Sequence, residues 1–410
     1  MHQQKSDFLS ACINMFKGLI GIGVLSLPIA FSRSGYLTGL FLLTFCGQLM
    51  IYVSKKMMEI ADKQLFQAQN ITQFCIQTLG KKSELLINIC LFGMQLSVCV
   101  AYVIYFTSYF QEIFCILIVN RQNYICQSRL IPLLFSLVLI FPLIFIKEIS
   151  KLQQWSLMAN ILVFFSLSVI SLFCIYNIFI NGVSQQKSAF KFDGLGNSVG
   201  VFIFTFEGIG LYFDIRYSMK EPYRFKQVLE YTINFTILLY SLIALLGYIT
   251  FGDNVQDVIL FNLPINGFFF NFVQLCYCVA LIFSYPLQIF PLVDVKNQYI
   301  YVNENYQENN DLDNINQKKI QYEIKSVFVR VFFTLFIFLS ALLLNKVSIF
   351  INLIGSVCGT TLSYAIPVII CNKCNKNLSK EQYYINCLIL IIGIGFGFFG
   401  IKSTIQAFYI

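Results

Sequence analysis

The chain has 410 residues, of which 57% are hydrophobic and 12% are charged, and its mean hydropathy is +0.71. Soluble proteins average about 25% charged residues, so this composition excludes a single soluble domain and indicates a protein that spans a membrane many times. The net charge of +8 does not indicate nucleic-acid binding, because the basic residues lie in short segments between apolar runs.

Runs of about 17 to 25 apolar residues predict eleven membrane-spanning helices. The expected spans are residues 8–32, 36–58, 85–113, 130–146, 153–180, 197–215, 228–251, 267–292, 326–344, 347–370 and 384–408. The stretch between the eighth and ninth spans, about 296–325, is rich in Asn, Gln and Tyr, and we interpret it as a mobile cytosolic linker.

Basic residues set the orientation of these spans. With the N-terminus in the cytosol, the inner segments hold 20 of the 28 lysines and arginines and the outer segments hold 7. Because cytosolic loops carry the excess of basic residues, we expect a cytosolic N-terminus and an extracytosolic C-terminus. Whether the membrane is the plasma membrane or a vacuolar or lysosomal membrane stays open.

The first span, Asn14–Phe31 (NMFKGLIGIGVLSLPIAF), contains its own interruptions, since Gly18, Gly21 and Gly23 weaken the helix and Pro28 follows them. Irregular backbone at membrane depth is tolerated only where it meets protein or a water-filled cavity. One interpretation is a broken helix whose freed amides bind an anionic group. The other is a close helix crossing, because small residues let backbones approach.

The sixth span carries a similar interruption. The Gly-Ile-Gly of residues 21–23 recurs at residues 208–210, one helix into each five-helix half, and such paired interruptions indicate an inverted-repeat transporter and its site. The triplet alone is weak, because it also occurs at residues 393–395.

Two blocks carry a family resemblance. NxxKGxIGxGVLSLPxAF with the following SGYLTG resembles the first-helix motif of the amino acid/auxin permease family, and VFIFTFEGIGLYFDIRYSMKEP at Val201–Pro222 is similar to the sixth-helix block of its proton-coupled amino acid transporter branch. Weaker matches lie at Trp155–Ile161 and Ser284–Phe290, so the resemblance covers the whole chain.

The resemblance implies an all-α, LeuT-like transporter of small neutral amino acids, with protons as the coupling ion and no need for sodium. It would form one domain of two inverted five-helix repeats, about 8–180 and 197–370, plus an extra helix at about 384–408. The substrate carboxylate would meet backbone amides and its ammonium would meet freed carbonyls. The expected binding residues are Gly21, Ile22, Gly23, Val24, Phe206, Glu207 and Gly208.

Two charged residues fall inside the spans. Glu207 lies beside the sixth-helix interruption, where an ionisable group costs about 2.5 kcal/mol or more and indicates a function. It either carries the coupling proton or only braces the unwound backbone. Lys17 either replaces a sodium ion electrostatically or reaches back to the cytosolic interface. In proton-coupled relatives a histidine precedes this lysine by three positions, but Asn14 stands there in this chain.

The remaining alternatives concern the class of function. The one histidine, His2, precedes the first span, which argues against an enzyme or proton relay that depends on imidazole. Cys371 and Cys374 form the one short-loop CxxC among the 14 cysteines, and without a second pair or nearby histidines it does not indicate a zinc site, while Cys115 and Cys126 flank one outer loop and could pair. We therefore expect no enzyme, cofactor or metal. The second hypothesis keeps the fold but makes the protein an amino acid sensor that does not transport.

Overall fold

The computed structural model describes residues 6–63, 68, 70–117, 128–145, 149–264, 267–304, 312–344, 346–375 and 378–408. These residues are almost entirely helical, and the one isolated β-bridge recorded among them joins Ser6 to Met219.

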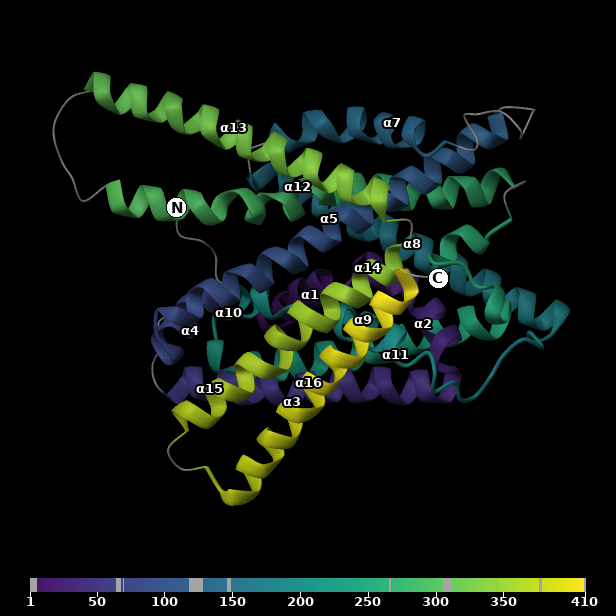
Figure 1. The fold of residues 1–410 in the computed structure, drawn as a ribbon, viewed down its shortest axis with the longest axis horizontal. Coiled ribbons are helices and arrows are strands. Elements are labelled where there is room, and N and C mark those ends of the chain that lie inside the picture. Colours follow the sequence, from purple (N-terminus) through teal and green to yellow (C-terminus); the bar gives the residue numbers. More distant parts are fainter. Residues whose placement is uncertain are drawn as a thin grey trace. The chain divides into compact units, whose positions relative to one another are not determined.

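The elements follow in chain order and carry the labels of Figure 1. In the first half they are α1 (Phe8–Leu19), η1 (Ile22–Ser26), α2 (Leu27–Ser34), α3 (Tyr36–Lys63), α4 (Ile71–Leu79), α5 (Lys82–Leu117), α7 (Leu130–Ile140), η2 (Phe141–Phe145) and α8 (Ile149–Asn181). In the second half they are α9 (Gly196–Thr205), α10 (Ile209–Ser218), η3 (Pro222–Arg224), α11 (Phe225–Phe251), η4 (Gly252–Asn254), η5 (Ile259–Asn262), α12 (Phe268–Glu304), α13 (Leu312–Leu343), α14 (Val347–Ile354), η6 (Gly355–Gly359), η7 (Thr361–Ala365), α15 (Ile366–Cys374) and α16 (Lys380–Phe408).

The described residues contain eight helices that are long and apolar enough to cross a membrane, and a ninth span if the bent pair Phe8–Leu19 and Ile22–Ser34 counts as one. Two further apolar helices, Leu130–Phe145 and Val327–Leu343, are shorter. The protein is therefore an all-helical, multi-pass membrane protein. The count of eleven and the division into two inverted repeats stay predictions.

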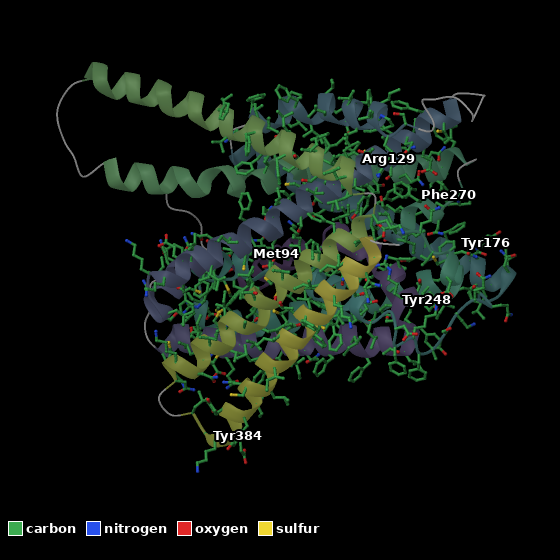
Figure 2. The ribbon with its side chains drawn as sticks, in the orientation of Figure 1. Met94, Arg129, Tyr176, Tyr248, Phe270 and Tyr384 are labelled. Atoms are coloured by element: carbon green, nitrogen blue, oxygen red, sulfur yellow. The ribbon has the colours of Figure 1, made fainter. Side chains whose placement is uncertain are left out.

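The chain forms two compact units, and each takes helices from both halves of the sequence. Unit 1 comprises Met1–Met94, Val169–Leu263 and Ser348–Ile410, and unit 2 comprises Gln95–Ser168 and Pro264–Val347. The helix α5 passes from one unit to the other after Met94, which is labelled in Figure 2. Both expected helix interruptions belong to unit 1.

The first span is broken, as the glycines predict. Helix α1 ends at Leu19, Gly21 is extended with φ −149° and ψ −162°, and the chain resumes as η1 and α2 at an angle of 52°. Pro28 lies in the first turn of α2, where its missing N–H has no intrahelical partner to lose. Gly35 ends α2 with φ 83°, and a Cβ there would lie 2.6 Å from the carbonyl oxygen of Ala189.

The sixth span is also interrupted. Helix α9 ends at Thr205, Phe206 to Gly208 are not helical, and α10 begins at Ile209. The amides of Phe206 and Glu207 donate to the carbonyls of Ile203 and Phe204, at 3.3 and 3.2 Å, so the last turn of α9 tightens before the break.

Helices α9 and α16 pack at very close range against the span Val347–Cys374, the tenth expected from the sequence, because glycines line the contact. A Cβ on Gly200 would lie 2.1 Å from the Asn352 carbonyl oxygen, and one on Gly355 would lie 2.0 Å from the Gly200 carbonyl oxygen. The tenth span is widened here into the two π-helical turns η6 and η7, which often mark functional sites in helices.

Asn352 joins the three helices of this crossing through its side-chain amide. Its Oδ1 accepts from the Gly200 amide at 2.9 Å, while its Nδ2 donates to the Gly196 carbonyl at 2.9 Å and to the Thr404 hydroxyl at 3.0 Å. The side chain is buried. Every polar group of this asparagine is thereby paired inside the bundle, as burial in an apolar environment requires.

The stretch at 296–325, interpreted above as a mobile cytosolic linker, is mostly helical, and its mobility and cytosolic location stay predictions. Helix α12 continues to Glu304 and α13 begins at Leu312, and only residues 305–311 of this stretch lie outside the described residues. The composition concealed a helical pattern, because Leu312, Ile315, Ile320 and Ile324 recur at spacings of three to five.

Unit 2 is held by side-chain to backbone hydrogen bonds between helices. Tyr105 on α5 donates to the Gln274 carbonyl of α12 at 3.2 Å, and Ser166 on α8 donates to the Val273 carbonyl at 3.2 Å. Arg330 is buried on α13 and donates to the Ile144 carbonyl at 2.6 Å.

We expect Asn352→Ala to lower the thermal stability of the protein, because it removes buried hydrogen bonds to the Gly200 amide, the Gly196 carbonyl and the Thr404 hydroxyl, each worth about 1 kcal/mol. The measurement is the melting temperature of purified protein in detergent. Asn181→Ala is the matched control, since Asn181 is exposed and bonds only to Asn177 on its own helix. An unchanged melting temperature for Asn352→Ala would contradict the role of this side chain.

Candidate functional site

The two helix breaks lie against each other inside unit 1. A Cβ on Gly208 would lie 3.0 Å from Leu19 Cδ2 and 3.4 Å from Met15 Cε, so the sixth-span break faces the end of α1. A Cβ on Gly23 would lie 2.8 Å from Thr205 Cγ2, so η1 packs on the end of α9. The two helix breaks, which are far apart in the sequence, are therefore adjacent in the fold.

The glycines at the two breaks have two different kinds of surroundings. Gly23 and Gly208 provide close packing, because added methyl groups would press on neighbouring side chains. Gly21 is different, since a Cβ built there meets nothing within 4 Å. The close-crossing interpretation therefore describes Gly23 and Gly208, whereas Gly21 leaves an open face beside the unwound backbone. That this backbone binds an anionic group stays a prediction.

The backbone groups freed by the first break have separate fates. Val24 donates back to the Gly21 carbonyl at 3.4 Å and is the first amide of η1 to do so. The amides of Ile22 and Gly23 precede it, at the helix start where amides lack intrahelical acceptors and the dipole is positive. On the other side of the break, the Leu19 carbonyl accepts a hydrogen bond of 2.7 Å from the Tyr240 hydroxyl.

Tyr240 is a site residue that the sequence did not reveal. It lies on α11, is fully buried, and its ring centroid is 5.6 Å from that of Phe206 beside the other break. One side chain therefore contacts both interruptions. The sequence signal was faint, because Tyr240 is one of 23 tyrosines and is separated from Leu19 by 221 positions.

Glu207 occupies the sixth-span break itself. Its carboxylate accepts a hydrogen bond from the Ile209 amide, at the start of α10. Its Oε1 is buried and has no hydrogen-bond partner among the described residues. Thus one carboxylate oxygen braces the backbone and the other stays available for a cation or a proton. Among the described residues, no hydrogen bond to the carbonyls of Thr205 and Phe206 is recorded either.

Lys17 lies in the last turn of α1 and is half-buried. The C-terminal end of a helix carries partial negative charge, so a lysine there is favourable without a carboxylate. No ion pair of Lys17 is recorded within the described part of the chain. Asn14, one turn earlier, is exposed.

One end of unit 1 is held by a cluster around Arg33. Its guanidinium donates to the Ser348 hydroxyl at 2.8 Å and to the Asn197 carbonyl at 3.2 Å, and it lies 3.9 Å from the Asp257 carboxylate. Asp257 in turn accepts from the Ser348 amide at 3.0 Å, at the start of α14, while its own carbonyl accepts from Ser26 at 3.1 Å. These contacts tie α2, α9, α14 and η1 together.

The other end of α9 and α10 is held by ion pairs and by the N-terminal segment. Asp62 on α3 accepts from Arg216 at 2.7 Å and from Lys226 at 3.1 Å. Asp7 pairs with Lys220 at 2.7 Å.

Backbone bonds reinforce the second of these contacts. Ser6 donates to the Ser218 carbonyl at 2.8 Å, and Lys220 donates to the Ser6 carbonyl at 3.0 Å. We call this contact, Ser6–Asp7 on Ser218–Lys220, the N-terminal latch. The two adjacent helix breaks therefore lie between two sets of polar contacts in unit 1, the Arg33 cluster at one end and the N-terminal latch at the other.

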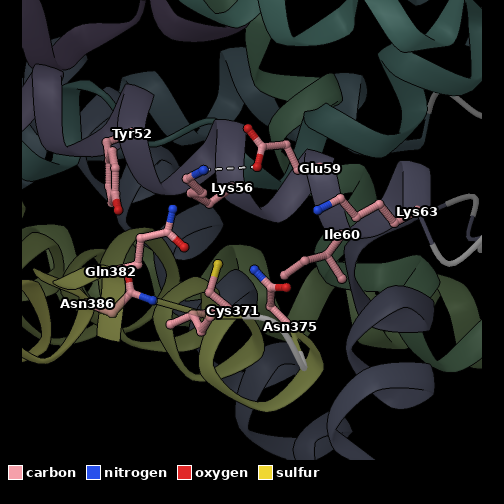
Figure 3. Close-up of a pocket in the computed structure, with 10 residues that line it drawn as sticks. Tyr52, Lys56, Glu59, Ile60, Lys63, Cys371, Asn375, Gln382 and Asn386 are labelled. Atoms are coloured by element: carbon pink, nitrogen blue, oxygen red, sulfur yellow. Dashed lines mark hydrogen bonds and ion pairs between the residues drawn. The ribbon is translucent and has the colours of Figure 1, made fainter. Parts of the chain in front are cut away.

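A separate polar cleft lies where α3, α15 and α16 meet, and Figure 3 shows its lining. It contains neither helix break and none of the site residues expected from the sequence. We treat it below as a distinct feature.

The arrangement at the breaks suits binding rather than covalent chemistry. It offers amides at a positive helix start, open carbonyls and one carboxylate oxygen, which are complementary to the two charged groups of a zwitterion. Among the described residues, no group of three or more His, Cys, Asp or Glu side chains could hold a metal ion. An all-helical membrane protein with two broken helices packed break to break is the construction of secondary transporters.

The family profile "Transmembrane amino acid transporter protein" matches residues 4–406, and the chain belongs to this family, the amino acid/auxin permease family. The resemblance seen in the sequence is thereby confirmed, and the protein is a transporter-family member rather than an enzyme.

The chain is 27% identical to vacuolar amino acid transporter 4 and 26% identical to vacuolar amino acid transporter 3 of Saccharomyces cerevisiae, over 96% of its own length in both cases. It spans only 56% of the length of each of these relatives. It is 24% identical to amino acid transporter AVT3B of Arabidopsis thaliana, over 97% of this chain and 92% of that one.

The crystal structure of MhsT in complex with L-phenylalanine shares the fold, with a TM-score of 0.58 at 12% identity over 98% of this chain and 100% of that one. The chain thus has a LeuT-like structural neighbour.

We expect Tyr240→Phe to weaken amino acid binding about fivefold, because it removes a hydrogen bond worth about 1 kcal/mol that holds the end of α1. Binding is measured with radiolabelled amino acids on purified protein. The control is Tyr176→Phe, since the Tyr176 side chain, labelled in Figure 2, is 64% exposed. Equal affinities for Tyr240→Phe and the native protein would show that the Leu19 carbonyl needs no such support.

Proposed function

We propose that the protein is a secondary active transporter of small neutral amino acids, coupled to protons and independent of sodium, which works by alternating access. The packed pair of helix breaks carries this proposal. The amides of Ile22 and Gly23, at the helix start between Gly21 and Val24, receive the substrate carboxylate, and the carbonyls at Phe206 to Gly208 with Glu207 receive its ammonium.

The surroundings of the breaks support a neutral substrate. Ile22, Val24 and Phe206 are buried and apolar, so a charged substrate side chain would be costly to bury there. The close packing at Gly23 and Gly208 supports a small substrate, because among these three glycines only Gly21 has open space beside it.

Glu207 is the residue that we propose for proton coupling. Its buried Oε1 has no hydrogen-bond partner among the described residues, whereas a glutamate that served only as a brace would gain from pairing both oxygens. Lys17, at the end of α1, supplies a fixed positive charge near the break and stands in for a sodium ion, so that sodium is not needed.

Two observations support the orientation, with the N-terminus in the cytosol. The basic residues gather on the side of the inner segments. Cys115, expected at an outer loop, is disulfide-bonded, whereas the described cysteines elsewhere are free, and disulfides persist outside the reducing cytosol. Cys126, the partner expected from the sequence, lies outside the described residues. The names of the yeast relatives support a vacuolar or lysosomal membrane.

We expect Gly21→Val to reduce amino acid binding more than tenfold without lowering the melting temperature, because a Cβ there meets no heavy atom within 4 Å and the side chain extends into the ligand's side of the break. Gly395→Val is the matched control, since a Cβ there also meets nothing within 4 Å and α16 carries no break. Gly208→Val is a poorer test, because it also clashes with Leu19. Undiminished binding in Gly21→Val would refute the proposed site.

We expect Glu207→Gln to abolish amino acid accumulation driven by a pH gradient while retaining exchange, because glutamine can still accept from the Ile209 amide but cannot titrate. The measurement is uptake by purified protein in liposomes, with pH and Na⁺ gradients imposed separately. Glu230→Gln is the control, since Glu230 pairs with Lys55 on α3, outside the breaks.

The same liposomes test the rest of the proposal. Accumulation driven by Na⁺ at clamped pH would contradict sodium independence. An intact response to pH in Glu207→Gln would place the coupling proton on another group. Binding without accumulation in the native protein would favour the sensor.

A further inference from the structure

A polar cleft opens between the ends of three membrane-spanning helices of unit 1, and none of the residues at the helix breaks lines it. One wall is a single face of α3, on which Tyr52, Lys56, Glu59 and Lys63 recur every three to four residues. The opposite wall comes from the end of α15 and the start of α16, as Figure 3 shows.

The cleft narrows inward from an exposed mouth. Lys63 is exposed and Gln382 is half-buried at the mouth, whereas Ile60, Cys371 and Asn386 are each at most 5% exposed. The enclosed part has room for about one water-sized group. A whole amino acid does not fit there, but a single oxygen of a larger group does.

Hydrogen-bond donors converge on the mouth without pairing to one another. Lys56 is paired with Glu59 at 3.0 Å, the one interaction drawn between the residues in Figure 3. For the side chains of Lys63, Asn375 and Gln382, no hydrogen bond or ion pair is recorded in the described part of the chain. Two lysines against one glutamate leave a net positive charge, and the amides add neutral donors.

The position of the cleft at the ends of three spans favours the level of the lipid headgroups. It lies where the spans Tyr36–Lys63 and Val347–Cys374 end and where Lys380–Ala407 begins. Tyr383 and Tyr384, 51% and 70% exposed at the start of α16, are the aromatic residues typical of a membrane interface. Tyr384 is labelled in Figure 2.

The surface beside the cleft suits lipid chains. Only 28% of the apolar window of α16 is buried inside the protein, and Leu388 and Ile391 expose 57% and 66% of their surface just beyond Tyr384. A molecule with an anionic head and apolar tails therefore finds donors in the cleft and an apolar helix face next to it.

We propose that this cleft binds the phosphate-bearing headgroup of an anionic membrane lipid, whose acyl chains lie along α16. A phosphate carries several acceptor oxygens and negative charge, which matches the donors of Lys63, Asn375 and Gln382. This site is separate from the amino acid site and is independent of which substrate is transported.

The test is native mass spectrometry of the purified, delipidated full chain, titrated with phosphatidylinositol phosphate and with phosphatidylcholine. We expect the anionic lipid to bind more tightly, and Lys63→Gln to weaken it about fivefold, the effect of one cation near an anionic surface. Asn375→Ala with Gln382→Ala keeps the charge but removes two amides, and should also weaken binding. Lys402→Gln, exposed at the far end of α16, is the charge-matched control and should leave the affinity unchanged.

Each other outcome overturns the proposal. Equal losses in Lys63→Gln and Lys402→Gln would mean that charge attracts lipid anywhere on the surface. Equal affinity for both lipids would mean that the headgroup charge is not recognised. Displacement of the lipid by inorganic phosphate at a similar concentration would show a site for a free anion, in which the tails play no part. Melting temperatures of all variants are recorded to separate loss of binding from loss of fold.

Discussion

Every backbone N–H and C=O at membrane depth must find a partner, because hydrocarbon offers none. At the two broken spans of unit 1, side chains pair with some of the backbone groups that the helices leave unpaired. The Tyr240 hydroxyl takes the Leu19 carbonyl, and the Glu207 carboxylate takes the Ile209 amide. We propose that other amides and carbonyls of the breaks bind the two charged ends of an amino acid. The backbone groups that the breaks release from helical pairing are thus the groups that we propose to bind the substrate.

Close packing around the breaks makes this arrangement possible. Gly200 and Gly355 bring α9 and the tenth span into backbone contact, and Asn352 joins them through its amide. In a membrane, helices gain little from the hydrophobic effect on associating, so such close contacts and buried hydrogen bonds hold them together. These contacts hold the first half of the sixth span, which ends at the break, against the tenth.

Local sequence features predicted the all-helical fold and the positions of both breaks, because glycine and proline act on the backbone where they stand. The same features did not distinguish Gly21, which faces open space, from Gly23 and Gly208, which pack on neighbours. That distinction depends on side chains almost 200 residues away. Tyr240 was missed for the same reason, since it contacts residues that only the fold brings near. The helical ends of α12 and α13 were missed because an Asn- and Gln-rich composition outweighed their apolar spacing.

The N-terminal latch and the Arg33 cluster differ in how far their charged side chains are exposed to water. The Lys220 and Asp7 side chains of the N-terminal latch are 57% and 70% exposed, whereas those of Arg33 and Asp257 are 20% and 24% exposed. Dissolved ions screen exposed charge pairs over a Debye length of about 8 Å at physiological ionic strength, and screen buried pairs much less. Dissolved salt therefore weakens the ion pair of the N-terminal latch more than that of Arg33 and Asp257, so the two ends of unit 1 respond differently to ionic strength.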